Sequence, residues 1–367
     1  MSTQAIKTWL SGHQWLLWLT VGMAVIISLN TLYSVFYGTE QIKIFYHQIV
    51  YVALGFLLAF LVSKYDYRIF RRHILVFFLL ALALLILVLI RGLRINGTTG
   101  WINLGLFSFQ PVEIAKLVTI LALASFFARY HNLIYSWKVL VFSFLIPLPF
   151  AALTMLQPDL GSTLALLGIW GGFIFASGAP KTQKITILAL TLFIALFGWF
   201  FLLKDYQRDR LSTFVNPERD ALGSGYNTLQ AVTAIGSGGI KGKGLGFGSQ
   251  SQLHFLPEAH SDFIFAVFAE ETGWIGVIIF LVASALFYFA IINITSSSKD
   301  NFGYFLGVGV FWFFIIHFFV NVGMNLGMLP IVGLPLPFLS AGGTNLFISF
   351  ILVGFIQSVG RLSMKVG

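Results

Sequence analysis

The sequence contains no cysteine and few charged residues. Of its 367 residues, 10% are Asp, Glu, Lys or Arg, whereas 58% are hydrophobic. The absence of cysteine excludes disulfide bonds and thiolate metal sites. The scarcity of charge excludes an ordinary soluble domain, because such domains carry about 25% charged residues. The composition is instead typical of a polytopic membrane protein.

Long apolar segments recur along the whole chain. A segment of about 20 apolar residues is long enough to cross a bilayer as a helix. The sequence predicts ten such spans, at about 15–37, 46–63, 74–90, 112–128, 139–156, 161–179, 185–203, 263–292, 302–326 and 345–360. The first has no small-residue cleavage pattern, so we expect a retained helix and not a signal peptide. We therefore predict an all-α membrane protein in which residues 1–367 form one domain.

The distribution of positive charge predicts the orientation. With ten spans, both termini lie on the same side of the membrane. The short loops and termini on that side contain twelve Lys and Arg residues, against three in the short loops opposite. Because positively charged loops stay in the cytoplasm, we expect cytoplasmic termini and an extracytoplasmic loop at 204–262, between spans seven and eight. The net charge of +9 is spread over these loops, which favours topology and anionic membrane lipid over nucleic acid as its explanation.

The large outer loop is rich in glycine, with nine glycines in the window 223–248. Glycine lets a backbone approach a ligand closely or adopt a positive φ. A mobile linker is the alternative, but the interleaved Lys241 and Lys243 argue against it. Neither the phosphate-binding G-x-x-x-x-G-K-[ST] sequence nor the G-x-S-x-G hydrolase motif occurs. His254 and His260 lack the spacing of a helical zinc pair, so we predict no metal cluster.

Three polar residues stand where apolar spans begin. Glu113 and Lys116 are three residues apart, so they share a helix face. Each is costly in hydrocarbon unless it is paired or faces a polar cavity. A structural ion pair and a pair that lines a site both remain open. Asp159 suits either the N-cap of the sixth span or a place in a site.

A polar stripe and an irregular segment follow near the C-terminus. His317, Asn321 and Asn325 recur every four residues within the ninth span, and interhelical hydrogen bonding explains them more simply than substrate contact. Residues 327–343 contain three prolines and four glycines, which forbid a regular helix. Irregular backbone near membrane depth is tolerated where it lines a cavity or is buried in protein. We therefore expect this segment and the 204–262 loop to meet over one cavity.

The polar residues of the outer side suit an anionic substrate that is held in the membrane. They are the carboxylates Asp262, Glu258, Asp159 and Glu113 and the cations Lys116, Lys241, Lys243, Arg208 and Arg210. If the substrate is a sugar on a lipid pyrophosphate, the leaving group needs cations and no general acid. One carboxylate then suffices as the base for an acceptor hydroxyl, and attack from the opposite face inverts the anomeric centre. Assistance by a divalent cation, Mg²⁺ or Mn²⁺, stays open.

Over nearly its whole length the chain resembles the SEDS family (shape, elongation, division and sporulation), the peptidoglycan polymerases of bacteria. The motifs that carry the resemblance are Asn96-Gly97 with Trp101-Ile102, Gln110-Pro-Val-Glu113, Gln157-Pro-Asp-Leu-Gly161, Asp205-Tyr-Gln207-Arg208, Gln230-Ala, Ile235-Gly-Ser-Gly-Gly239, Gly242-x-Gly-x-Gly to Gln250, Phe255-Leu-Pro-Glu258, His260-Ser-Asp-Phe-Ile-Phe265, Glu270-Glu271-x-Gly273, and Pro335-Leu-Pro-Phe338 with Gly342-Gly343. The segment 327–337 is similar to the RodA elongation branch more than to the FtsW division branch.

The resemblance implies a glycosyltransferase that joins lipid II into β-1,4 glycan strands outside the bacterial cytoplasmic membrane, releases undecaprenyl pyrophosphate and serves cell elongation and rod shape. It also implies a class B penicillin-binding protein and the elongation machinery as partners. Asp262 matches the essential aspartate, the expected base, while Glu113 and Lys116 match an intramembrane ion pair. Further candidate substrate contacts are Trp101, Gln157, Asp159, Arg208, Arg210, Lys241, Lys243, Gln250, Glu258, His260 and Ser340.

The chain departs from the family pattern at three places. Val112 and Ala341 stand where serine and tyrosine are usual, and Thr344-Asn345 stands where two serines are common. Three other functions remain as alternatives: a lipid II flippase or transporter, a polymerase of the division branch, and a scaffold without catalysis that activates its partner. Asp262 separates a polymerase from a flippase and a scaffold, because only a polymerase needs a base at the outer rim of the membrane.

Overall fold

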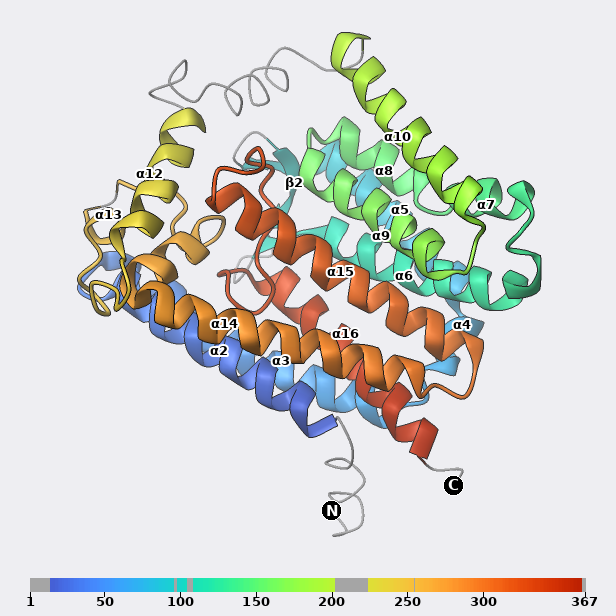
Figure 1. Cartoon of the computed structure of the whole chain (residues 1–367), viewed down its shortest axis with the longest axis horizontal. Helices are drawn as coiled ribbons and strands as arrows, with labels where there is room; N and C mark the ends of the chain where they lie inside the picture. The colour runs from blue at the N-terminus through green and yellow to red at the C-terminus, as the bar shows by residue number, and fades with distance from the viewer. Residues whose placement is uncertain (1–13, 96–97, 104–107, 202–223, 254, 365–367) are drawn as a thin grey trace.

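A computed structural model describes residues 14–95, 98–103, 108–201, 224–253 and 255–364, which form a bundle of long helices (Figure 1). The helices are α2 (Gln14–Phe36), α3 (Lys43–Lys64), α4 (Arg68–Arg72), α5 (Ile74–Arg91), α6 (Pro111–Tyr130), α7 (Trp137–Phe144), α8 (Leu148–Leu156), α9 (Leu160–Ala176), α10 (Lys181–Phe201), α12 (Ser224–Ser237), α13 (Ser249–Gln252), α14 (Ile264–Ser296), α15 (Asn301–Asn325) and α16 (Gly343–Met364), with short 3-10 turns at Glu40–Ile42 and His131–Leu133.

The helices confirm the predicted class of helical membrane protein. Eight helical segments among the described residues are long and apolar enough to cross a membrane. They coincide with the first five and the last three expected spans, and the fifth is divided into α7 and α8 at Pro147. Helices α9 and α10 stand at the sixth and seventh expected positions, and α9 has 17 residues. The count of ten crossings stays a prediction.

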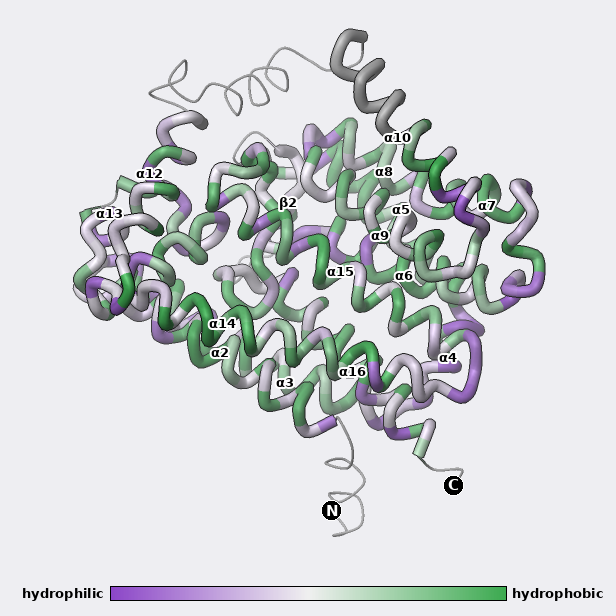
Figure 2. Tube along the Cα trace, viewed as in Figure 1, coloured by the Kyte–Doolittle hydropathy of each residue, from purple (hydrophilic) through white to green (hydrophobic). Residues whose placement is uncertain are grey.

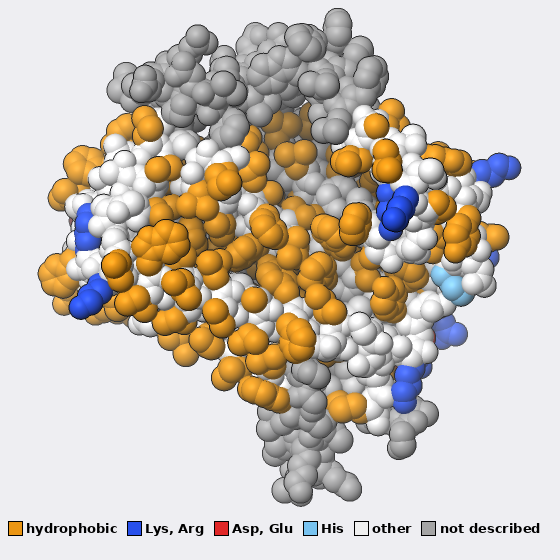
Figure 3. Space-filling view, in the orientation of Figure 1, with side chains coloured by type: hydrophobic (Ala, Val, Ile, Leu, Met, Phe, Trp, Pro, Cys, Tyr) orange, Lys and Arg blue, Asp and Glu red, His pale blue; other side chains and the backbone are white. Residues whose placement is uncertain are grey.

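Charged segments gather at the two ends of the bundle. Helix α4 and the turn between α14 and α15 lie at one end, and the loop between α12 and α13, which contains Lys241 and Lys243, lies at the other (Figure 1). Hydrophobic residues follow the middle of the long helices, and hydrophilic ones concentrate near α4 and near α13 (Figure 2). On the face shown in Figure 3, apolar side chains cover the centre, while Lys and Arg side chains stay near the two ends. This is the pattern that a bilayer around the middle of the bundle requires.

The centre of the bundle consists of α6, α15 and α16. Helix α16 packs against α3 and α6, α15 packs against α6 and α9, and α14 packs against α2. Phenylalanine rings fill much of the interior, including the stacked pair Phe127 and Phe173, whose centroids lie 5.6 Å apart. A buried hydrogen bond from Gln357 to Gln14 joins α16 to α2. Since lipid supplies no hydrophobic drive between helices, close packing and such bonds hold the bundle together.

A small antiparallel sheet precedes α6, where the sequence predicts only a loop. It contains β1 (Leu93–Ile95), β2 (Thr98–Asn103) and β3 (Ser108–Phe109), in the order β1-β2-β3. Trp101 on β2 lies opposite Leu93 on β1. The sheet fixes the position of Trp101 at the same end of the molecule as the start of α6.

Helix α14 contains a sharp break that the expected eighth span did not include. Gly273 has φ 64° and ψ −164°, so residues 264–272 form a short separate helix before the long crossing segment. A Cβ at this position would lie 2.3 Å from the backbone nitrogen of Gly242. Both the left-handed conformation and this close approach require glycine.

Candidate functional site

One cavity of about 480 Å³ lies beside the start of α14. It is lined by Trp101 of β2, by Gln110 and Asp159 at the starts of α6 and α9, by the segment 258–262, and by residues of the segment 331–345. The expectation that the outer loop and the proline-rich segment meet over one cavity is therefore confirmed for the part of the loop that the structure describes.

Asp262 lines this cavity, and two amides of α15 hold its backbone. The Nδ2 atoms of Asn321 and Asn325 donate to the carbonyl of Asp262 at 3.1 and 3.0 Å. Asn321 also donates to the carbonyl of Leu334 at 2.9 Å, and Asn325 accepts from the N–H of Ala266 at 3.1 Å. The bond between Asn325 and Ala266 is of the interhelical kind predicted for the polar stripe, and the bonds to the carbonyl of Asp262 position the segment that carries it.

The Glu113–Lys116 ion pair is fully buried behind the cavity wall. Nζ of Lys116 lies 2.8 Å from Oε1 of Glu113 and 3.3 Å from Nε2 of His317. Because the ammonium is only a donor, Nε2 of His317 must accept, and its Nδ1–H then donates to the carbonyl of Pro335 at 2.9 Å. Nδ2 of Asn345 donates to Oε2 of Glu113 at 3.1 Å. The pair therefore reaches the cavity through Pro335 and Asn345, which line it.

Asp159 and Gln157 hold the wall formed by α8, α9 and the sheet. The Asp159 carboxylate caps α9 by accepting from the N–H of Ser162 at 2.9 Å, and it also lines the cavity. Burial raises the pKa of Asp159, although the hydrogen bond from Ser162 opposes this. Gln157 is buried and donates to the carbonyl of Leu85 at 3.0 Å. The structure thus gives Gln157 a packing role and leaves Trp101 and Asp159 at the cavity.

Glu258 and His260 line the cavity beside Asp262, while Ser340 lies behind it. Oγ of Ser340 donates to the carbonyl of Ser261 at 2.6 Å and accepts from the N–H of Leu336 at 2.8 Å. It therefore joins the outer loop to the proline-rich segment. Nε2 of His260 lies 3.9 Å from the Glu258 carboxylate. Burial lowers the pKa of His260, and the negative charge of Glu258 opposes that shift.

The side chains around the cavity are acidic. Three carboxylates line it, those of Asp159, Glu258 and Asp262, and no Lys or Arg is among the described residues that line it. Among the described residues, no group of three or more His, Cys, Asp or Glu side chains is placed to hold a metal ion.

The chain was compared with known protein families, proteins and structures. The family model described as cell cycle protein, which covers FtsW, RodA and SpoVE, matches residues 8–365. The chain belongs to the FtsW/RodA/SpoVE family. A probable peptidoglycan glycosyltransferase FtsW of Thiomicrospira cyclica is 37% identical over 346 residues, 93% of this chain and 88% of that protein. The peptidoglycan glycosyltransferase MrdB of Escherichia coli K12 is 36% identical over 325 residues, 87% of this chain and 86% of that protein.

Solved structures of family members share the fold. A chain from a peptidoglycan synthase complex superimposes with a TM-score of 0.79 at 29% identity, covering 96% of this chain and 98% of its own. The rod shape determining protein RodA of Thermus thermophilus gives a TM-score of 0.69 at 26% identity, covering 96% and 97%. The recognition of the family from sequence motifs is thereby confirmed.

In this family member, the glycine-rich stretch packs against the end of the short helix before the break in α14. The buried carboxylate of Glu270 accepts from Nζ of Lys243 at 2.8 Å and from the N–H of Gln250 at 3.1 Å. The Glu271 carboxylate accepts from the N–H of Gly246 at 3.1 Å. The glycines thus allow close packing within the protein, where the sequence was interpreted as favouring approach to a ligand. The adjacent pair Glu270-Glu271 was the available signal for this role.

The two described lysines of the outer loop, Lys241 and Lys243, do not line the cavity. Lys243 is engaged with Glu270, and Lys241 is exposed and does not line the cavity. Arg208 and Arg210 lie outside the described residues. Contact of these four side chains with phosphate remains a prediction.

The family departures are accommodated by local contacts. Asn345 donates to Glu113, and Oγ1 of Thr344 accepts from the N–H of Gln110 at 3.2 Å, so both replacements still join α16 to α6. Val112 packs in an apolar cluster of α5, α6, α8 and α9, where a serine hydroxyl is not required. Ala341 lines the cavity and offers it a methyl group in place of a hydroxyl.

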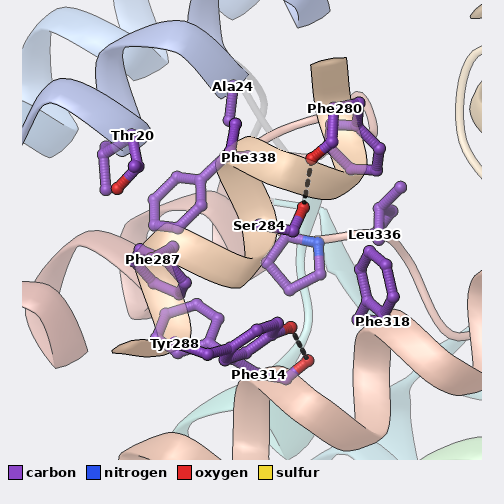
Figure 4. Close-up of a pocket in the computed structure, with 13 residues that line it drawn as sticks. Thr20, Ala24, Phe280, Ser284, Phe287, Tyr288, Phe314, Phe318, Leu336 and Phe338 are labelled. Atoms are coloured by element: carbon purple, nitrogen blue, oxygen red, sulfur yellow. Dashed lines mark hydrogen bonds between the residues drawn. The ribbon is translucent and has the colours of Figure 1, made fainter. Parts of the chain in front are cut away.

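A second cleft is apolar and much smaller. It lies between α2, α14, α15 and the proline-rich segment, with Phe280, Phe287 and Phe318 among its walls (Figure 4). The Tyr288 hydroxyl donates to the carbonyl of Phe314 at 3.1 Å. With about 40 Å³ of space, the cleft holds little more than one water-sized group, so it is not a substrate site.

Proposed function

We propose that the protein is a peptidoglycan glycosyltransferase that polymerises lipid II on the outer side of the cytoplasmic membrane, with Asp262 as its base. The observation that carries this proposal is the place of Asp262, at the cavity and fixed through its carbonyl by Asn321 and Asn325. The relatives named peptidoglycan glycosyltransferase FtsW and MrdB support it, because this chain matches most of their length.

In the proposed reaction, the Asp262 carboxylate takes the proton of an acceptor sugar hydroxyl. The hydroxyl oxygen forms a bond to the anomeric carbon of the donor while the bond from that carbon to the pyrophosphate oxygen breaks. Undecaprenyl pyrophosphate leaves, and attack from the opposite face inverts the anomeric centre. A positioned base of this kind contributes about 10² to 10⁴ in rate.

The described Lys and Arg side chains do not line the cavity, so another source of positive charge must bind an anionic donor there. The N-termini of three helices can supply it. The starts of α6, α14 and α16 border it at Gln110, Asp262 and Gly343. Each helix start carries about half a positive charge, which favours phosphate. The start of α9 is already capped by Asp159.

The orientation and the partner belong to the same proposal. The basic turns at the α4 end favour a cytoplasmic position for that end and for both termini. The similarity to a chain of a peptidoglycan synthase complex supports a penicillin-binding protein, of class B, as the partner that cross-links the strands. The segment 327–337 supports the elongation branch. Rescue of rod shape in cells depleted of their elongation polymerase, without rescue of cells depleted of their division polymerase, is the expected result.

The decisive experiment is polymerisation of purified lipid II by the protein in complex with its penicillin-binding protein. Asp262→Asn should abolish glycan strands while it still binds the partner. Glu40→Gln is the matched control, because it removes an exposed carboxylate outside the cavity and should keep full activity. Strands of normal length from Asp262→Asn would refute the assigned base. Translocation of lipid II in vesicles without polymerisation by the native complex would instead establish a flippase.

A further inference from the structure

The glycine-rich loop, defined here as residues 238–248, exposes large apolar side chains. Ile240, Leu245 and Phe247 have exposed fractions of 69%, 53% and 76%. A single exposed apolar side chain is ordinary, but three within one short loop indicate a surface that something covers.

The charge of the loop indicates what covers it. Between Asp220 and Glu258 the sequence contains no acidic residue. Lys241 is exposed, whereas Lys243 is paired with the buried Glu270. Exposed apolar side chains beside an exposed lysine match the boundary of a bilayer, where apolar groups enter the acyl region and ammonium groups meet lipid phosphates.

The loop is continuous with the lipid-facing side of α14. The carbonyls of Gly239 and Ile240 accept hydrogen bonds from the N–H groups of Trp274 and Ile275 at 2.9 and 3.2 Å. These two residues begin the long crossing segment of α14, and their side chains are exposed, as is that of Ile278 one turn later. An exposed tryptophan at the end of a crossing helix is typical of the headgroup level. The loop is therefore attached at that level.

The end of α2, which also contacts this region, indicates the same headgroup level. Nε2 of Gln252 donates to the carbonyl of Ser34 at 2.8 Å, which joins α13 to the end of α2. Tyr33 and Tyr37, which flank this contact, are exposed. Tyrosine is also enriched at the headgroup level. The ends of α2 and α14 therefore both indicate that the loop lies at this depth.

We propose that the 238–248 loop is a membrane anchor, in which Ile240, Leu245 and Phe247 insert into the headgroup boundary of the outer leaflet. Lys241 then lies at the lipid phosphates. The insertion does not depend on the proposed activity, and only the assignment to the outer leaflet rests on the proposed orientation. Glu270 accepts hydrogen bonds from Lys243 and from the N–H of Gln250, which stand on either side of Leu245 and Phe247. Insertion of the loop therefore also fixes the depth of residues 264–272, the short helix that carries Glu270.

The absence of native cysteine makes this proposal directly testable, because one introduced cysteine can carry one spin label. The probe is Phe247→Cys in the full chain, reconstituted in nanodiscs of phosphatidylethanolamine and phosphatidylglycerol. Collision with oxygen reports lipid, and collision with a water-soluble nickel chelate reports water. Ile279→Cys on the lipid-facing side of α14 and Lys299→Cys in the turn between α14 and α15 are the matched lipid and water controls.

The expected result is a several-fold lower nickel accessibility for Phe247→Cys than for Lys299→Cys, with an oxygen accessibility that approaches that of Ile279→Cys. Since Phe247 is the most exposed of the three loop side chains, its replacement leaves the interior unchanged. A nickel accessibility equal to that of Lys299→Cys would overturn the proposal. Protection from nickel that arises only when the penicillin-binding protein is added would also overturn it, because the loop would then be a protein-docking surface.

Discussion

The buried pair Glu113–Lys116 offers the sharpest test of how the interior of this protein is stabilised. Both side chains are almost completely buried, and their charged atoms lie 2.8 Å apart. Removing one partner of such a pair leaves an uncompensated charge and typically costs about 3–5 kcal/mol of unfolding free energy. We expect losses of this size for Lys116→Met and for Glu113→Gln.

The double variant should recover much of the loss. With both charges removed, the main remaining defect is Nε2 of His317, which loses its donor Lys116. A buried acceptor left unsatisfied costs about 1–3 kcal/mol. The double variant Glu113→Gln/Lys116→Met should therefore be more stable than either single variant.

The measurement is unfolding by sodium dodecyl sulfate in mixed micelles, followed by the fluorescence of the nine tryptophans. Helix content from circular dichroism checks that each variant starts folded. Two results would refute the reasoning. One is a Lys116→Met protein within about 1 kcal/mol of the native chain, which would mean that water or a neighbour neutralises the remaining charge. The other is a double variant whose loss equals the sum of the single losses, because independent sites are additive.

Three further outcomes are expected. Asn325→Ala removes one of two amide donors to the carbonyl of the proposed base, so it should lower the free energy of unfolding by about 1–3 kcal/mol in the same titration. It should also lower kcat more than it changes KM, and an unchanged kcat contradicts the positioning role. Gly273→Ala should cost more than 1 kcal/mol, because φ is 64° and the methyl group would meet the backbone of Gly242, whereas Gly171→Ala on α9, with open space, should be neutral or better. Burial lowers the pKa of His260 below 6.5, so the unfolded chain binds its proton more readily and native stability should fall as pH drops below 6.5; His260→Asn should weaken that dependence in thermal unfolding at pH 5 to 7.5.

Several features of the site followed from residue chemistry alone. Glu113 and Lys116 were expected to pair because hydrocarbon penalises each charge, and they do. The stripe of His317, Asn321 and Asn325 was expected to form interhelical hydrogen bonds for the same reason. His317 contacts Lys116 of α6 and Asn325 accepts from Ala266 of α14, whereas Asn321 donates to carbonyls outside the helices. Such predictions succeed because the cost of an unpaired polar group in an apolar medium leaves few alternatives.

Other features depended on contacts between distant segments. The role of the glycine stretch could not be predicted from its own sequence, because its partners, Glu270 and Glu271, follow it by about 25 residues and bond mainly to its backbone. Lys243 was expected at a phosphate, but its nearest anion is Glu270. A charge pattern predicts what a side chain can bind and does not identify which partner the fold brings near.

The sequence by itself determined that this protein is a helical membrane protein and, through the order of its motifs, that it belongs to its family. Both follow from local properties, since the length of an apolar run and the identity of a motif do not change with folding. Only the tertiary structure decided which of the polar residues share the cavity. Asp262, Asp159 and Trp101 lie at it, whereas Lys116 and Lys243 do not line it. The reason is physical: Lys116 meets a carboxylate on its own helix, at Glu113, whereas Lys243 meets Glu270, 27 residues along the chain, only because the packing of the helices brings the two segments together.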